Sequence, residues 1–242
     1  MNDDLDQLTR NLKLRRIREI LDRELERAEQ KGPSYADFLQ RLLREEFQDQ
    51  QMRFLENRIR RAKLPEQWAL QTFPWEKQPG VHKPTIEQLA TLDFLGRGSN
   101  IVFIGPTGTG KTGLAIGILL EALQAGRRGY FVKAQDLFDE MYTTLADRSS
   151  RKLLDRLVGY EPLVVDEMGY LNLRPEQSNM FFKLMEERYG RGSATIITTN
   201  LDYDDWYAFL GQKQMVGALL DRLRHRCTTI RIDGPSLRRP EE

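Results

Sequence analysis

The chain has 242 residues, which is enough for one large hydrophobic core and a smaller appended region but too few for two large domains. Its 37 basic and 36 acidic side chains nearly cancel, so net charge alone does not indicate a nucleic-acid-binding protein. The single cysteine, Cys227, excludes an intramolecular disulfide and a cysteine-rich zinc site. We expect a cytoplasmic protein without a membrane-spanning segment, because its start is acidic and its apolar runs are short.

The N-terminal quarter of the chain has the pattern of a helical hairpin or small bundle. Apolar residues recur near helical spacing over residues 5–25 and again over 38–59. The triplet 31–33, Lys-Gly-Pro, ends the first predicted helix, and Ser34 with Asp37 resembles a capping box that begins the second. The apolar stripe is either a core or a face that docks a partner.

A proline-rich segment, residues 65–84, follows these helices. Trp68, Phe73 and Trp75 lie within it. We interpret the segment as an extended linker that pins its aromatic side chains onto the next domain. The alternative is that these rings stack on nucleic-acid bases. The sequence therefore predicts three parts: a helical domain (1–64), a linker (65–84) and a nucleotide-binding domain (85–242).

From residue 85 onward, apolar runs alternate with helical patterns, which predicts an α/β fold with a parallel sheet covered on both faces. Ligands on such sheets bind at the carboxyl ends of the strands. The predicted strands are 100–104, 129–132, 162–165, 194–198 and 228–232. The predicted helices are 85–96, 111–125, 134–145, 151–158, 175–189, 204–210 and 213–225.

A glycine-rich loop directly follows the first predicted strand. Residues 105–112 read Gly-Pro-Thr-Gly-Thr-Gly-Lys-Thr, the pattern of a loop whose backbone N–H groups cradle phosphates at a helix N-terminus. Lys111 supplies a positive charge to the phosphates, and the Thr112 hydroxyl can bind Mg²⁺. The order of strand, loop and helix argues against a chance turn. The predicted nucleotide-contacting residues are Gly105, Pro106, Thr107, Gly108, Thr109, Gly110, Lys111, Thr112 and Gly113.

Two further strands end in polar residues. Asp166 and Glu167 follow the apolar run 163–165; Asp166 can hold Mg²⁺, and Glu167 can polarise an attacking water. Asn200 follows the run 196–199 and can orient that water beside the γ-phosphate. The alternative roles are an exposed acidic turn for the carboxylates and a helix N-cap for Asn200.

Arginines near the C-terminus are candidates for contact with phosphate. Arg222 is our candidate for a finger that acts on the nucleotide of a neighbouring subunit, because a planar guanidinium suits the charge of a phosphoryl transition state. Arg224 and Arg226 are ordinary cations at a helix C-terminus or DNA contacts. Arg238 is the candidate for a second arginine that senses phosphate; its alternative is a basic tail.

With these motifs the chain resembles the AAA+ ATPases and, within them, the IstB-like helper ATPases of bacterial insertion sequences, relatives of the DnaC helicase loaders. The resemblance covers residues 60–239 well. It rests on the motifs at 105–112, 163–170, 196–200 and 221–226, together with Leu-Asp-Phe-Leu at 92–95 and Gly-Pro-Ser-Leu-Arg at 234–238. It implies an AAA+ three-layer sandwich with a five-stranded sheet, a preceding helical domain and no C-terminal lid domain.

The resemblance also implies roles and partners. Lys111 and Thr112 match the phosphate loop, Asp166 and Glu167 the magnesium ligand and catalytic acid, Asn200 the first sensor, Arg222 the finger and Arg238 the second sensor. ATP and Mg²⁺ are the implied cofactors. The implied partners are double-stranded DNA, a transposase and further copies of the chain in a ring or filament. Gly113 departs from the family pattern, since relatives often carry a larger residue there.

Because the net charge is close to zero, any binding of DNA would depend on local clusters of basic residues. If subunits stack, a few phosphate contacts on each add up across the assembly. The alternative for each residue is an ordinary solvated surface. Two other functions remain open: a helicase loader, and a small-molecule kinase with the same phosphate loop. The candidate DNA contacts are Arg58, Arg60, Arg61, Lys63, Lys133, Arg151 and Lys152.

Overall fold

The computed structural model describes residues 3–169, 171–211 and 213–238, so the last four residues of the predicted nucleotide-binding domain lie outside the described part. The chain forms two compact units that divide between Asn57 and Arg58. The N-terminal unit contains helices α1 (Asp3–Asn11) and α2 (Arg15–Lys31) and most of α3 (Tyr35–Ala62). Its buried apolar residues are Ile17, Ile20, Leu21 and Leu42.

The prediction of one continuous helix up to residue 31 is wrong, because the chain turns between α1 and α2. Lys13 takes a left-handed φ of 57°, and α1 folds back so that Asp6 lies 3.6 Å from the Arg18 guanidinium. A tertiary contact stabilises the new helix start. The buried Glu46 carboxylate of α3 accepts hydrogen bonds from the backbone N–H groups of Arg16 (2.7 Å) and Ile17 (3.0 Å).

The second unit contains the end of α3, a connecting segment (residues 63–82) and the whole α/β region. The connecting segment holds two short 3₁₀ helices, η1 (Leu70–Thr72) and η2 (Trp75–Lys77), so it is not extended throughout as predicted. The predicted helix over 85–96 is two helices, α4 (Lys83–Ala90) and α5 (Asp93–Gly96), because Leu92 takes a φ of 68°.

All five predicted strands are present, and they form one parallel sheet in the order β2-β3-β4-β1-β5. Parallel strands need crossover connections, and helices supply these between successive strands. The strands shift by at most three residues from the predicted bounds. The strand bounds are β1 Asn100–Ile104, β2 Tyr130–Lys133, β3 Leu163–Met168, β4 Thr195–Thr199 and β5 Cys227–Arg231.

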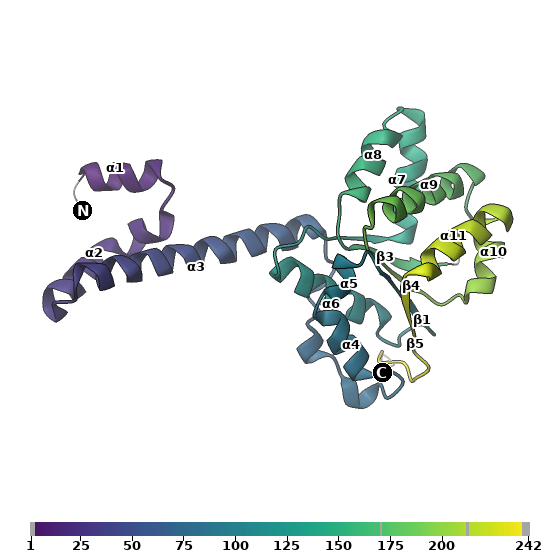
Figure 1. The fold of residues 1–242 in the computed structure, drawn as a ribbon, viewed down its shortest axis with the longest axis horizontal. Helices are drawn as coiled ribbons and strands as arrows, with labels where there is room; N and C mark the ends of the chain where they lie inside the picture. Colours follow the sequence, from purple (N-terminus) through teal and green to yellow (C-terminus); the bar gives the residue numbers. More distant parts are fainter. Residues whose placement is uncertain (1–2, 170, 212, 239–242) are drawn as a thin grey trace. The chain divides into compact units, whose positions relative to one another are not determined.

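Helices cover both faces of the sheet, which confirms the predicted three-layer α/β sandwich (Figure 1). Helices α4 and α6 (Lys111–Gln124) lie on one face, where α6 contacts β1, β3 and β4. The opposite face packs against α7 (Ala134–Ala146), α8 (Ser150–Val158), α9 (Pro175–Arg191) and α11 (Lys213–His225). The short η3 (Tyr203–Asp205) and α10 (Trp206–Leu210) join β4 to α11. The central strands β1 and β4 are buried along their whole length, as expected of a parallel sheet covered on both faces.

Arg188 of α9 is a buried cation that joins three elements of this unit. It is 1% exposed, and its guanidinium donates to the Thr195 hydroxyl (2.9 Å) and to the carbonyls of Leu157 (2.7 Å), Tyr160 (3.0 Å) and Ala194. Burial lowers the pKa of Arg188 to about 9, which leaves the group charged at neutral pH. The guanidinium therefore satisfies buried carbonyls that no apolar side chain would satisfy.

Replacing Arg188 by Met should lower the free energy of unfolding by about 3 kcal/mol, because it leaves these buried carbonyl acceptors unpaired. Denaturant unfolding followed by circular dichroism measures this change. Arg191→Met, on an exposed position of the same helix, is the matched control and should change stability by less than about 0.5 kcal/mol. Equal stability of the two variants would show that the Arg188 hydrogen bonds contribute little.

Candidate nucleotide-binding site

A cleft of about 630 Å³ lies at the carboxyl ends of β1, β3 and β4. The glycine-rich loop forms one wall, with Thr107, Gly108, Gly110, Lys111 and Thr112 at its surface. This is the position that a parallel sheet offers to ligands. Most of the predicted nucleotide-site residues therefore meet in one place. The other predicted residues that line the cleft are Gly113, Lys133, Asp166, Glu167, Asn200 and Arg238.

The loop leads directly into α6, so its N–H groups meet the positive end of a helix dipole. Gly108 and Gly110 take φ values of 85° and 90°, which L side chains rarely adopt. The Lys111 ammonium donates to the carbonyls of Gly105 (2.8 Å) and Pro106 (2.7 Å). Burial, aided by the nearby Arg238 guanidinium, lowers the pKa of Lys111, whereas Asp166 and Glu167 oppose that shift. A phosphate would give this half-buried cation a stronger partner than two carbonyls.

Asp166 is 2% exposed and lies beside two hydroxyl groups. Its Oδ1 accepts hydrogen bonds from the Thr112 hydroxyl (2.8 Å) and the Thr198 hydroxyl (2.6 Å). Burial raises the pKa of Asp166, and the two hydrogen bonds oppose the rise. These are hard oxygen donors of the kind Mg²⁺ prefers, and among the described residues no larger carboxylate cluster completes an all-protein site. These oxygen atoms therefore fit a Mg²⁺ ion that takes its remaining ligands from phosphate oxygens.

Glu167 lies on the next residue in a left-handed conformation, with a φ of 58°. β3 continues to Met168, and its register with β4 shifts between Val165 and Met168. The strand therefore does not end at the acids as predicted. The irregularity turns Glu167 outward, where its Oε2 lies 3.7 Å from the Lys133 ammonium and its backbone N–H donates to the Thr198 hydroxyl (2.9 Å). A carboxylate exposed at the cleft is accessible to water.

Asn200 follows β4 and also lines the cleft. Asn200 is not a helix N-cap, because Asp202 occupies that position before η3. The backbone N–H of Asp202 donates to the Asp205 carboxylate (3.0 Å). A Cβ on Gly169 would lie 3.0 Å from the Asn200 side-chain oxygen, so the Asn200 amide packs close to the loop after β3. The alternative role of Asn200 as a helix N-cap is therefore excluded.

Arg238 reaches the cleft on the C-terminal segment, which we define as residues 232–238. This segment runs along the phosphate loop, and the Leu237 N–H donates to the Gly108 carbonyl (2.8 Å). Within the described residues, no helix follows β5. Arg238 is exposed and close enough to Lys111 to affect its pKa.

The connecting segment packs on the other side of the loop and on α6. Phe73 is 4% exposed, its ring centroid lies 4.7 Å from that of Trp75, and the Trp75 indole donates to the Leu70 carbonyl (3.2 Å). A Cβ on Gly110 would come within 2.8 Å of the Phe73 ring, so the predicted pinning of Phe73 onto the next domain is confirmed, whereas these contacts of Trp75 are with residues of its own segment. Trp68 lines the cleft, and a Cβ on Gly113 would come within 3.3 Å of its indole ring. The absence of a side chain at Gly113 therefore makes room for Trp68.

Gly105, Pro106 and Thr109 of the loop do not line this cleft, and Arg222 lies away from it. Arg222 comes from the last turn of α11 and lines a separate cavity of about 180 Å³ together with Asn100 and Thr195, the first residues of β1 and β4. Its side chain is 41% exposed and pairs with Glu186 at 3.2 Å. It therefore lies at the opposite end of the strands from the nucleotide cleft of the same protomer.

The candidate DNA contacts have mixed surroundings. Arg58 donates to the Leu123 carbonyl at the end of α6 (2.8 Å), and Arg151 pairs with Asp155 (2.7 Å) and Glu187 (2.9 Å). Lys63 lies over the Tyr130 ring, and Lys133 pairs with Glu167. Arg60, Arg61 and Lys152 are exposed.

Two residues beside the phosphate loop and Asp166 were not predicted from the sequence. Thr198 holds both Asp166 and the Glu167 backbone, and Gln78 contacts the phosphate loop from the connecting segment. Thr198 had one signal, since it is a polar residue directly after the apolar pair Ile196 and Ile197 and two positions before Asn200. Gln78 had none, because its partners lie 31 and 157 residues away.

Comparison with known sequences agrees with these motifs. The family model described as IstB-like ATP binding protein matches residues 7–242. A relative from Pseudomonas aeruginosa, named as an ATP-binding protein of insertion sequence IS21, is 33% identical over 239 residues, which are 99% of this chain and 90% of that protein. A relative from Geobacillus stearothermophilus, named for insertion sequence IS5376, is 36% identical over 209 residues, 86% of this chain and 83% of that protein.

Solved structures show the same fold. The DnaC helicase loader superposes with a TM-score of 0.55 at 25% identity, covering 62% of this chain and 88% of the loader. DnaI superposes with a TM-score of 0.59 at 19% identity, covering 71% of this chain and 90% of DnaI. None of the helices in the described residues is both long and apolar enough to cross a membrane. The chain belongs to the family of IstB-like ATP-binding proteins of insertion sequences and has an AAA+ fold.

Proposed function

We propose that this protein is a DNA-dependent ATPase that assembles on duplex DNA and helps a transposase engage its target DNA. The observation that carries the proposal is the cleft at the carboxyl ends of the strands. There the phosphate loop, Asp166, Glu167 and Asn200 all face one space. The names of the relatives associate the family with ATP and with insertion sequences. A mobile element needs a transposase, which is therefore the partner we assign.

We assign the residues of the cleft to steps of hydrolysis. Lys111 and the loop N–H groups hold the β- and γ-phosphates. Thr112 and Asp166 would hold Mg²⁺, which neutralises phosphate charge when bound. Glu167 polarises a water for attack on the γ-phosphate, and Asn200 orients that water. The exposed position of Glu167 supports its role, because a buried carboxylate would not reach solvent water.

The position of Arg222 supports hydrolysis at a joint between protomers. It lies at the far end of the strands from its own cleft, so it can complete only the cleft of another protomer. Such a head-to-tail contact generates a ring or a helical filament. ATP then promotes assembly, and hydrolysis removes the γ-phosphate that the joint requires. We propose that the N-terminal helices dock the DNA or the transposase.

Two arguments bear on other functions. A cleft that needs a second protomer does not suit a small-molecule kinase, which would close around its acceptor. The fold similarity to the DnaC helicase loader favours a loader as the second candidate. The two functions differ in what the assembled protein binds, a transposase or a hexameric helicase. Co-sedimentation of the ATP-bound protein with each of them distinguishes the two functions.

The DNA arm of the proposal predicts binding that depends on ATP and on salt. Anisotropy of labelled duplexes of unrelated sequence should show similar affinities, because the chain has no recognition-helix motif. The affinity should fall at least about tenfold between about 50 and 200 mM salt, as released counterions oppose binding. Lys111→Ala should lose the ATP-dependent part of binding, and Lys183→Ala on the surface of α9 is its control. A flat salt titration would exclude this mode of DNA binding.

A further inference from the structure

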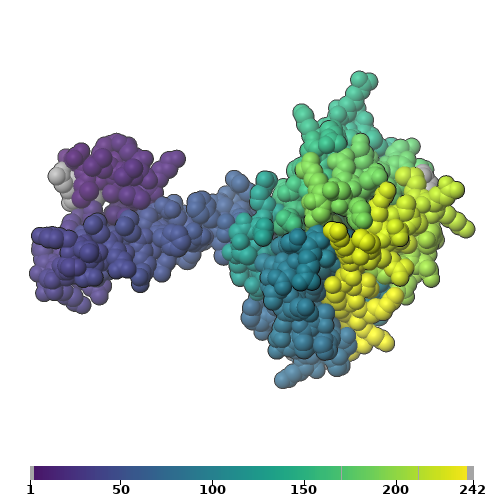
Figure 2. All heavy atoms as spheres, viewed as in Figure 1, coloured from purple at the N-terminus to yellow at the C-terminus, as the bar shows by residue number. Residues whose placement is uncertain are grey.

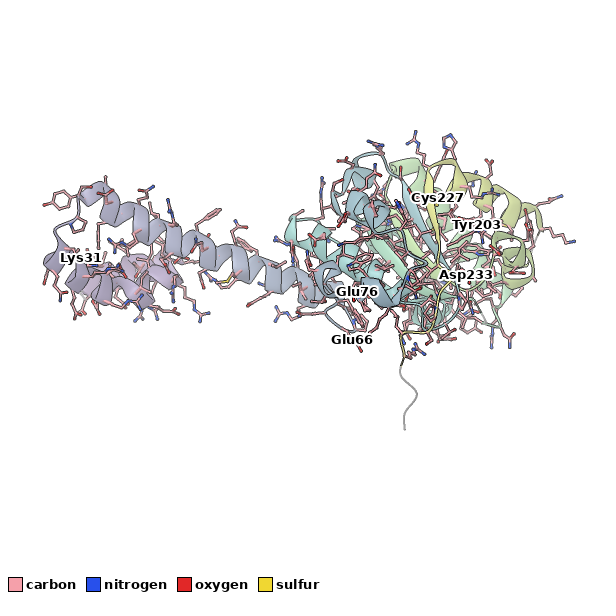
Figure 3. The ribbon with its side chains drawn as sticks, turned by 90° about the horizontal axis from the view of Figure 1, so that it is seen from below. Lys31, Glu66, Glu76, Tyr203, Cys227 and Asp233 are labelled. Atoms are coloured by element: carbon pink, nitrogen blue, oxygen red, sulfur yellow. The ribbon has the colours of Figure 1, made fainter. Side chains whose placement is uncertain are left out.

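Two segments from opposite ends of the α/β unit meet at the phosphate loop. In the space-filling view, blue residues that follow α3 lie beside yellow residues from the C-terminal part of the chain (Figure 2). The contact is close, since a Cβ on Gly80 would lie 2.5 Å from the Asp233 carbonyl oxygen. Figure 3 labels Glu76 in the connecting segment and Asp233 where the C-terminal segment begins. This junction is distinct from the phosphate-binding surface of the loop.

Gln78 is the centre of the junction. Its side chain is 0% exposed, and its amide nitrogen donates two hydrogen bonds, one to the Thr109 carbonyl of the phosphate loop (3.0 Å) and one to the Pro235 carbonyl (3.0 Å). One amide group thus joins the loop to the segment that carries Arg238. A second hydrogen bond, from the Leu237 N–H to the Gly108 carbonyl (2.8 Å), also joins this segment to the loop.

The chemistry of position 78 argues against a simple packing role. The Gln78 side-chain oxygen is buried and has no hydrogen-bond partner among the described residues, which lowers stability. An apolar side chain of the same length would fill the space without that cost. Gly234 packs directly on this oxygen, since a Cβ there would lie 1.7 Å from it. What only glutamine supplies is the pair of donated hydrogen bonds.

We propose that Gln78 is a positioning residue that ties the C-terminal segment to the phosphate loop and thereby holds Arg238 at the γ-phosphate. The inference rests on the proposed ATPase function and adds to it the means by which the second arginine is placed. Arg238 lies on a segment without helix or strand, so its backbone depends on such bonds for a fixed position. The proposed contact of Arg238 is with the phosphate that ATP has and ADP lacks.

The test is nucleotide discrimination by the full-length protein. Gln78→Met keeps the length of the side chain and removes both donated bonds. It should weaken ATP binding about tenfold and ADP binding less than about twofold, measured by calorimetry with Mg²⁺ present. Arg238→Ala should show the same selective loss, and the double variant should be no worse than either single one. Gln71→Met, in the same segment but exposed, is the matched control.

A general loss of structure predicts different results. Equal weakening of ATP and ADP by Gln78→Met, or losses that add to those of Arg238→Ala, would overturn the proposal. If Gln78→Met does not fold, Gly234→Ala tests the same junction from the other side, because its methyl group displaces the Gln78 amide. An unchanged ATP-to-ADP ratio in that variant would also overturn it. Failure of the wild-type protein to bind ATP would instead contradict the proposed function itself.

Discussion

Replacing Arg222 by Ala should lower the ATP turnover number on DNA at least about a thousandfold and leave the affinity for ATP nearly unchanged. A finger arginine stabilises the charge of the phosphoryl transition state and touches the nucleotide only across a joint between protomers. The side chain lies outside its own cleft and pairs with Glu186 at 3.2 Å, so its loss does not alter the phosphate loop. Steady-state phosphate release and equilibrium ATP binding measure the two quantities.

Two variants serve as controls for this prediction. Arg222→Lys retains a positive charge but not the planar fork, and we expect it to remain strongly impaired. Arg224→Ala, two residues later, should keep turnover at saturating DNA within about threefold, because Arg224 packs over the Tyr203 ring (5.1 Å) and has no assigned contact with the nucleotide. Full turnover by the Arg222→Ala protein would show that hydrolysis does not need an arginine from a neighbouring protomer.

Replacing Glu167 by Gln should lower turnover by about two to four orders of magnitude and leave ATP bound. The amide keeps the shape of the side chain but cannot accept a proton from the attacking water. Because assembly requires the bound triphosphate, the variant should form DNA complexes that persist after excess ATP is removed. Single-turnover hydrolysis and gel-shift lifetimes measure the two effects.

Glu176→Gln, in the first turn of α9, is the matched control and should behave as the wild type. The Lys133 ammonium lies 3.7 Å from Glu167, so the Gln variant also loses this ion pair. Lys133→Met separates the two effects, since it removes the pair and keeps the acid. Turnover by Glu167→Gln within about tenfold of wild type would assign the general base to another group.

The parts of the fold that depend on local sequence were predictable. Strand β1, the phosphate loop and the start of α6 lie within 14 consecutive residues, 100–113, and each has its own signal in composition and glycine spacing. Strands β1 and β3 were predictable for the same reason, because strands buried on both faces read as apolar runs, here 101–104 and 163–165. β5 is an edge strand that is only partly buried and has a weaker signal. The candidate site followed from them, since the carboxyl ends of parallel strands meet at one edge.

The errors occur where distant residues decide the local conformation. The helix start at Arg15 depends on the Glu46 carboxylate, which lies about thirty residues later in the chain. The left-handed Glu167 depends on Thr198 of the next strand, whose hydroxyl accepts the Glu167 N–H. No pattern within a short window contains such partners. The Gln78 junction could not be predicted for the same reason, because the partners of Gln78 are distant in sequence.

The measurement that tests the shared site most directly is complementation between two inactive proteins. Lys111→Ala protomers cannot hold nucleotide but retain Arg222, whereas Arg222→Ala protomers hold nucleotide but lack the finger. Mixed in equal amounts on DNA, they should regain up to about a quarter of the wild-type ATPase rate, because random pairing gives that share of joints both an intact cleft and an intact finger, and joints at an empty cleft form less readily. A mixture no more active than the sum of its two components would contradict the account.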